Sequence, residues 1–311
     1  MTWQLTGDVE EFQRVAGPYL AADPVGTTAL ITVSETVRRH GPSVYGAGGP
    51  PPRFGWWRAD PSAPVEAAFV QTPPHAPVFG TLDPGHARSL ARALRTAGGD
   101  VPVSGVRGAD GGAQAFADEW AGPGSWSVVC RLRLYRLGEL TPPEPPGRAR
   151  RACAGDVPLV AAWMRGFAAD IGGDADADQT ANAARRIADG CLWLWEVEER
   201  PVSMASRSPV LVGQSRVSPV YTPAGFRGRG YAGAVTAAVS RAAIEDGAEL
   251  VLLFADVDNP TSSALYQRIG YRPVRDHVDL AFGQDMSAAS RPVRDALPPR
   301  SPSGSGRAPT P

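Results

Sequence analysis

"GFRGRGYAGAV", residues 225–235, is the stretch on which the interpretation of this sequence depends. Gly228, Gly230 and Gly233 fit G-x-G-x-x-G, the glycine-rich turn that seats the pyrophosphate of a dinucleotide. Such a turn leaves bare backbone N–H groups at the start of a helix, where the helix dipole favours an anion. The stretch therefore predicts a phosphate-binding loop, and the rest of the chain must indicate which cofactor carries the phosphate.

The order of predicted elements addresses that choice. Helices are expected over 155–172 and 176–190, and a strand pair and a further strand over 191–210 and 214–223. After the loop come a helix (229–246), a buried strand (248–256), a short helix (259–270) and a last strand (271–282). Antiparallel strands followed by one strand–loop–helix–strand unit indicate an α+β fold. A dinucleotide fold needs repeated βα units with the loop after the first strand, although Asp256 lies where a ribose-binding acid would fall.

Composition limits the class of protein. The 311 residues are 43% hydrophobic and 20% charged, which suits a globular chain long enough for two domains. The net charge of −1 gives no overall attraction to nucleic acid or an anionic membrane, and no apolar run reaches membrane-spanning length. Cys130, Cys153 and Cys191 lie far apart, and the four histidines show no ligand spacing. We expect reduced thiols, no metal and a cytoplasmic protein, since the N-terminus also lacks signal-peptide features.

Two proline-rich stretches divide the chain. Residues 141–150 should form an extended connector, and residues 286–311 a disordered tail. Between them, residues 148–285 form one predicted domain, and residues 1–140 form another with the same order of elements. A local echo, "PVEAA" at 64–68 and "PVSMA" at 201–205, favours a diverged internal duplication.

The second region resembles the GCN5-related N-acetyltransferase (GNAT) family across about residues 148–283. The resemblance rests on "VYTPAGFRGRGYAG" (220–233), which fits the family's Q/R-x-x-G-x-G/A loop, on "DNPTSSALYQRIGY" (258–271), and on their order and separation. It implies a three-layer fold, in which helices flank a mixed, mostly antiparallel sheet. It also implies two tandem GNAT-like domains, of which the N-terminal copy is degenerate because it lacks the loop.

The resemblance further implies acetyl-CoA as the acyl donor. In the family, Asn259 bonds the cofactor arm and Tyr266 protonates the departing thiolate. Asn259 also suits a helix N-cap, and Tyr266 also suits a core aromatic at helical spacing from Leu265 and Ile269. The residues expected at the cofactor are Pro219, Val220, Tyr221, Arg227, Gly228, Arg229, Gly230, Tyr231, Ala232, Gly233 and Asn259.

The general base stays open. Asp170, Glu196, Glu198 or a water relay could accept the proton of the amine, and an amine could also enter neutral. Nothing beside Cys191 suggests an activated nucleophile. The expected function is direct acetyl transfer to a small amine or a protein N-terminus, with one acetyl-CoA per chain and the N-terminal copy covering an edge or face of the catalytic sheet. The alternatives are a non-catalytic acyl-CoA sensor and, less favoured, an NAD(P)-dependent oxidoreductase.

Overall fold

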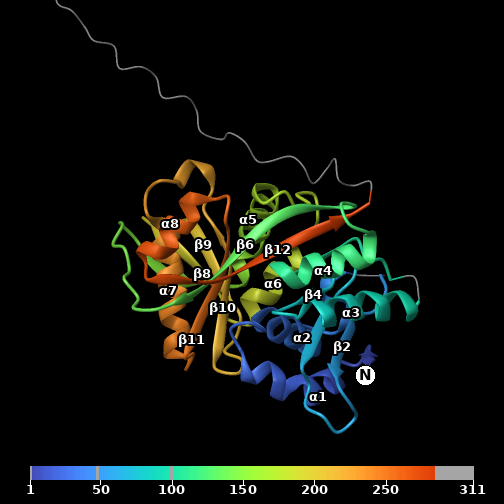
Figure 1. Ribbon diagram of the computed structural model, residues 1–311. Coiled ribbons are helices and arrows are strands. Elements are labelled where there is room, and N and C mark those ends of the chain that lie inside the picture. The colour runs from blue at the N-terminus through green and yellow to red at the C-terminus, as the bar shows by residue number, and fades with distance from the viewer. Residues whose placement is uncertain (1, 47–48, 99–100, 284–311) are drawn as a thin grey trace, which may run out of the picture.

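The chain folds around one twelve-stranded sheet with helices on both faces (Figure 1). The structure, a computed structural model, describes residues 2–46, 49–98 and 101–283, so the tail expected over 286–311 lies outside it. The strands are β1 (Thr2–Thr6), β2 (Arg53–Arg58), β3 (Ala67–Gln71), β4 (Val78–Phe79), β5 (Gly105–Ala109), β6 (Trp126–Leu137), β7 (Arg148–Arg151), β8 (Leu192–Val197), β9 (Arg200–Arg207), β10 (Gln214–Tyr221), β11 (Leu250–Asp256) and β12 (Tyr271–Phe282).

The α-helices pack in pairs on opposite faces of the sheet. In the first half, α1 and α2 share a core with one face of β2 and β3, while α3 and α4 share a core with the other face. In the second half, α5 and α6 contact one face and α7 the other. The α-helices are α1 (Val9–Ala22), α2 (Thr28–His40), α3 (Pro84–Thr96), α4 (Asp110–Ala121), α5 (Val157–Asp170), α6 (Thr180–Ala188), α7 (Tyr231–Glu245) and α8 (Pro260–Arg268).

Local sequence explains several of these elements. On β8, Leu192 and Leu194 face α5 and α6, whereas Trp193 faces α7, as the period of two in a strand requires. Glu198 and Glu199 both have positive φ angles (50° and 61°) in the two-residue turn that joins β8 to β9, the geometry of a type I′ hairpin. The layered, mostly antiparallel arrangement confirms the fold class expected from the sequence.

The order of elements repeats once. Strand, two helices, three strands, helix, strand, helix and strand describe both β1 to β6 and β7 to β12. A diverged internal duplication would give such a repeat, and the duplication itself stays a prediction. The sequence did not predict β1, β5, α4 or β7, which are short or rich in small residues and so carry a weak periodic signal.

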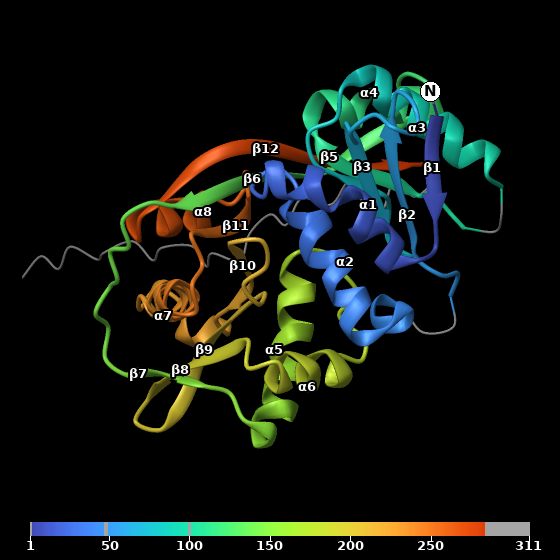
Figure 2. The ribbon, with the colours of Figure 1, turned by 90° about the horizontal axis from the view of Figure 1, so that it is seen from below.

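The two halves exchange their last strands. The strand order is β1-β2-β3-β4-β5-β12-β6-β11-β10-β9-β8-β7, so β6 lies between β11 and β12, and β12 lies between β5 and β6. Both long strands cross the molecule side by side (Figure 2). The first region thus covers the β11 edge of the second half, and it does so by supplying an internal strand, β6, which local sequence patterns could not reveal.

The sheet is irregular where β10 separates from β11. The parallel pairing of β10 with β11 runs from Gln214↔Leu250 to Val217↔Leu253 and then stops. Beyond it, β10 has a register shift between Val217 and Val220 and continues to pair only with β9. β11 continues to Asp256, paired with β6. A bulge of this kind re-aims a strand, and here the two strands separate directly before the glycine-rich loop.

Candidate functional site

The glycine-rich loop forms the turn that its sequence predicts. Gly228 and Gly230 have φ angles of 77° and 83°, which residues with side chains adopt at a cost, and Gly230 is the N-cap of α7. Among the described residues, the backbone N–H groups of Gly228, Arg229 and Gly230 have no protein acceptor. The first N–H groups of a helix also have no partner within it, so Tyr231, Ala232 and Gly233 extend the row. These groups can hold an anion.

The strand before the loop has one free edge where the cofactor arm is expected. Val220 and Tyr221 pair with Ala205 and Met204 of β9, and β11 no longer pairs with them on the other side. Pro219 lies within the register shift and has no N–H to donate. Backbone polar groups of this segment can therefore face a ligand between β10 and β11.

The two loop arginines differ. Nε of Arg227 donates to the carbonyl oxygen of Thr222 at 2.9 Å, and the same guanidinium pairs with the Asp170 carboxylate. Its guanidinium carbon also lies 5.9 Å from the centre of the Tyr221 ring. These contacts hold Arg227 against the end of β10. Arg229 is exposed, which leaves its side chain available to a ligand.

The proline-rich connector lies against this loop. N–H groups of Gly138 and Thr141 donate to the carbonyls of Gly270 and Ile269 at 3.0 and 3.1 Å. A Cβ atom at Gly233 would lie 3.2 Å from the ring of Pro143, so the absence of a side chain lets the connector approach α7. Between them is a cavity of about 240 Å³, lined by Thr141, Pro142, Pro143, Gly230, Gly233, Leu265, Arg268 and Ile269.

Asn259 caps α8. Its Oδ1 accepts a hydrogen bond from the backbone N–H of Ser262 at 3.0 Å, and Pro260 occupies the first turn. The N-cap interpretation of this residue is therefore observed. The second role, a bond to the cofactor arm, stays a prediction.

Tyr266 lies partly buried on α8, and its ring centre is 6.1 Å from that of Tyr271 and 6.5 Å from that of Tyr135. Burial raises the pKa of its hydroxyl to about 12, so the group stays protonated at neutral pH. A protonated hydroxyl is what a proton donor needs, although the same packing also fits a core residue.

The candidate bases lie in different surroundings. Asp170 pairs with Arg227, close to the loop. Oε1 of Glu196 accepts from Nε of Arg150 at 2.5 Å and is buried on β8, two strands away from β10. Glu198 is in the turn between β8 and β9. Asp170 and Glu196 are thus each paired with an arginine, and the identity of the general base stays a prediction.

The remaining candidate groups are the Cys191 thiol and the side chains that could bind a metal. Burial raises the pKa of the Cys191 thiol, so it stays protonated. Within residues 2–46, 49–98 and 101–283, no three His, Cys, Asp or Glu side chains gather as a metal site would require. In the same ranges, no helix is long and apolar enough to cross a membrane.

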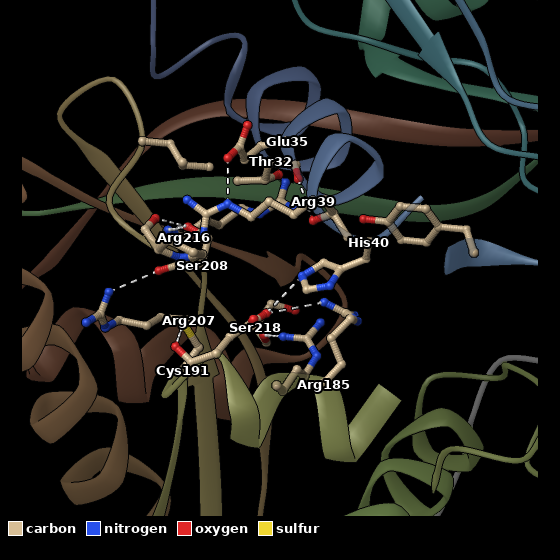
Figure 3. A pocket seen from close by; sticks show the side chains of 16 residues that line it. Thr32, Glu35, Arg39, His40, Arg185, Cys191, Arg207, Ser208, Arg216 and Ser218 are labelled. Carbon is tan, nitrogen blue, oxygen red and sulfur yellow. Dashed lines mark hydrogen bonds and ion pairs between the residues drawn. The ribbon is translucent and has the colours of Figure 1, made fainter. Parts of the chain in front are cut away.

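The sequence analysis missed a basic pocket between the two halves (Figure 3). It has a volume of about 90 Å³, and α2 of the first half faces α6 and the β9–β10 segment of the second half across it. Burial lowers the pKa of Arg186 and that of Arg216 to about 10. The lining residues come from segments far apart in the chain, so no local sequence pattern predicts the pocket. The one local hint of it is a charged residue, Arg216, on a predicted strand. The pocket arginines are Arg39, Arg185, Arg186, Arg207 and Arg216.

Comparisons with known proteins extend over both halves. Residues 202–278 match the family model described as FR47-like protein, and no functionally curated protein matches the chain. The chain is similar to a GCN5-related N-acetyltransferase from Kribbella flavida, with 21% identity, a TM-score of 0.51, and coverage of 71% of this chain and 88% of that one.

Two further solved structures cover nearly all of the described residues. An acetyltransferase of the GNAT family from Colwellia psychrerythraea has 12% identity and a TM-score of 0.56, covering 91% of this chain and 100% of that one. A Drosophila protein has 13% identity and a TM-score of 0.62, covering 90% of this chain and 98% of that one. Identities this low show likeness of fold alone. The chain thus has the fold of the GCN5-related N-acetyltransferases, and its residues 202–278 are FR47-like.

Proposed function

We propose that this protein is an acetyl-CoA-dependent N-acetyltransferase that transfers the acetyl group directly to an amine. The proposal rests on the separation of β10 from β11 after Val217↔Leu253, directly before a loop in which the N–H groups of residues 228–230 have no acceptor in the described part of the chain. An extended ligand arm can enter between strands only where they no longer pair, and a pyrophosphate at its end needs such a loop.

The residues present fit acetyl-CoA. The N–H row from Gly228 to Gly233 suits the pyrophosphate, and exposed Arg229 adds a cation beside it. The neighbouring cavity between the connector and α8 offers apolar walls and Arg268 to the nucleotide end. When bound, acetyl-CoA supplies an acetyl group activated as a thioester. We propose one such molecule per chain, held by the second half.

Tyr266 is the proposed general acid. In the transfer, a bond forms between the amine nitrogen and the acetyl carbon, and the bond from that carbon to sulfur breaks. The amine gives up one proton, and the Tyr266 hydroxyl donates one to the leaving sulfur before it is reprotonated from solvent. The raised pKa of Tyr266 keeps this proton in place up to about pH 11.

The second candidate function is a non-catalytic acyl-CoA sensor. It is favoured by one observation: the carboxylates of Asp170 and Glu196 are each paired with an arginine. A nicotinamide-dependent oxidoreductase fits less well. The parallel pairs among the described strands are β4–β5 and β10–β11, and a dinucleotide fold needs a run of adjacent parallel strands.

Calorimetric titration with acetyl-CoA, CoA and NADPH distinguishes these functions. We expect acetyl-CoA and CoA to bind at one per chain and NADPH not to bind. Thiol release in the presence of amines then separates a transferase from a sensor. Binding of NADPH without acetyl-CoA would contradict the proposal, and acetyl-CoA binding without turnover for any amine would favour the sensor. The acceptor is proposed to be a small amine or a protein N-terminus, and the free thiols suit the reducing cytoplasm.

A further inference from the structure

The basic pocket between the halves begins where β10 and β11 separate. Ser218, which lines it, is the first residue after the last β10–β11 pair, Val217↔Leu253. The guanidinium carbon of Arg216 lies 5.9 Å from the centre of the Phe254 ring, and Phe254 is the first residue of β11 beyond that pair. The pocket therefore adjoins the gap between β10 and β11, where the arm of acetyl-CoA is proposed to lie.

Most charges in the pocket are already paired. Glu35 accepts from Arg39 at 2.6 Å, and Asp189 lies 3.2 Å from Nε2 of His40. Arg185 lies 3.9 Å from the same aspartate, and Arg207 pairs with Asp246. Both carboxylates that line the pocket are thus already engaged by basic side chains of its wall.

Two arginines have no carboxylate among the described residues. Arg186 is satisfied by neutral groups, since Nη1 donates to the carbonyl of Ser218 at 2.9 Å and to Oγ of Ser206 at 3.0 Å. Arg216 has no hydrogen bond from its guanidinium and no ion pair in the described part of the chain. A partly buried guanidinium without an acceptor is costly unless an anion or water completes it.

We propose that Arg216, supported by the positive charge of Arg186, binds an anionic group of the acceptor. The acceptor is then a small amine that carries a carboxylate or a phosphate within a few bonds of its nitrogen. This inference rests on the proposed function for the transfer itself. An oxyanion matches the planar donors of a guanidinium, and the volume of about 90 Å³ has room for a small group. From Arg216, the amine would extend toward Ser218 and the thioester.

The proposal also gives the first half a part in the site. Thr32, Arg39 and Tyr45 come from that half and line the pocket. Figure 3 shows Thr32 and Arg39 on the α2 side of it. A buried hydrogen bond of 3.0 Å from Oγ1 of Thr28 to Oε1 of Gln214, the first residue of β10, holds α2 in place. The first half thus helps to form the wall of the acceptor site.

Matched amines test the proposal. Alanine is compared with alaninamide, and phosphoethanolamine with ethanolamine, for acetyl transfer by the full chain. Variants Arg216→Gln and Arg216→Lys are compared with Arg241→Gln, which changes an exposed arginine of α7. We expect wild type and Arg241→Gln to prefer an anionic amine by at least ~10-fold in kcat/KM. Arg216→Gln should lose the preference and Arg216→Lys keep part of it, all with unchanged affinity for acetyl-CoA. The pair that shows the preference identifies a carboxylate or a phosphate.

Equal rates with charged and neutral amines, or a preference that survives in Arg216→Gln, would overturn the proposal. If acetyl-CoA binds but no amine is acetylated, the proposed transferase function is wrong, and the anion-binding site is tested separately by ligand binding. Acetate and inorganic phosphate are then titrated against thermal unfolding. A rise of a few degrees in Tm in wild type and Arg241→Gln, absent in Arg216→Gln, supports the subsite, and an identical response in all three rules it out.

Discussion

Removal of β6 should unfold the second half, although that half carries the proposed cofactor loop. A fragment of residues 145–285 lacks β6, which pairs with β12 over eleven residue positions and with β11 over five. It leaves β11 with an unpaired edge in the middle of the sheet. A fragment of residues 123–285 restores β6 at the N-terminal end of the same half.

The magnitude follows from what β6 buries. Leu134 and Tyr135 are fully buried, and each such side chain contributes about 1.5–3 kcal/mol. Roughly ten ladder hydrogen bonds at about 0.5–1 kcal/mol net each add about 5–10 kcal/mol. The total of about 8–16 kcal/mol matches or exceeds the stability of a typical domain, about 5–15 kcal/mol.

Urea unfolding followed by circular dichroism, with size-exclusion chromatography, checks the result. We expect the 145–285 fragment to aggregate or show no cooperative transition, and the 123–285 fragment to fold. In the full chain, Leu134→Ala should cost about 2–5 kcal/mol, whereas Val129→Ala, at an exposed position of the same strand, should cost less than about 0.5 kcal/mol. A monomeric 145–285 fragment that unfolds cooperatively and binds acetyl-CoA would refute the reasoning.

Three further predictions concern the site and the core. Gly230→Val should abolish acetyl-CoA binding in calorimetry, because a β-branched residue is strained at the φ angle of 83° that Gly230 adopts. The control Gly225→Ala, in the same loop but without a positive φ, should bind acetyl-CoA normally. Equal affinities of the two variants would mean that the loop is a plain turn. Tyr266→Phe should bind acetyl-CoA nearly as well as wild type but lose on the order of 10²-fold in kcat. Because the pKa of Tyr266 is about 12, wild-type kcat should not fall through loss of the Tyr266 proton below about pH 11. An unchanged kcat in Tyr266→Phe, with the chemical step shown to be rate-limiting, would mean that Tyr266 is only a core residue. Burial, and next the nearby Arg275 and Arg107, lower the pKa of His277 to about 4. The unfolded chain therefore protonates this histidine as pH falls below about 6.5, whereas the folded chain does not. The free energy of unfolding should drop by about 2 kcal/mol between pH 7 and pH 5. Urea unfolding at about pH 7 and pH 5 should show a smaller loss of stability for His277→Gln than for wild type. An equal loss in both proteins would show that other groups are responsible.

Much of the second half could be predicted from local sequence, because the signals act over a few residues. The glycines of 228–230 require positive φ angles, and they do form the turn into α7. Asn259 before Pro260 predicts a helix start, and Asn259 is the N-cap of α8. The apolar run at 248–256 predicts a buried strand, which is β11.

What the sequence by itself determined is therefore most elements of the second half and the glycine-rich turn before α7. Only the tertiary structure decided which strands pair. Alternation along residues 126–137 shows that β6 has two faces, but not that its neighbours are β11 and β12, more than a hundred residues away. The pocket around Arg216 has the same origin: α2, α6 and β10 meet there because the exchanged strands join both halves into one sheet, and the energies that select this pairing come from contacts distant in the chain.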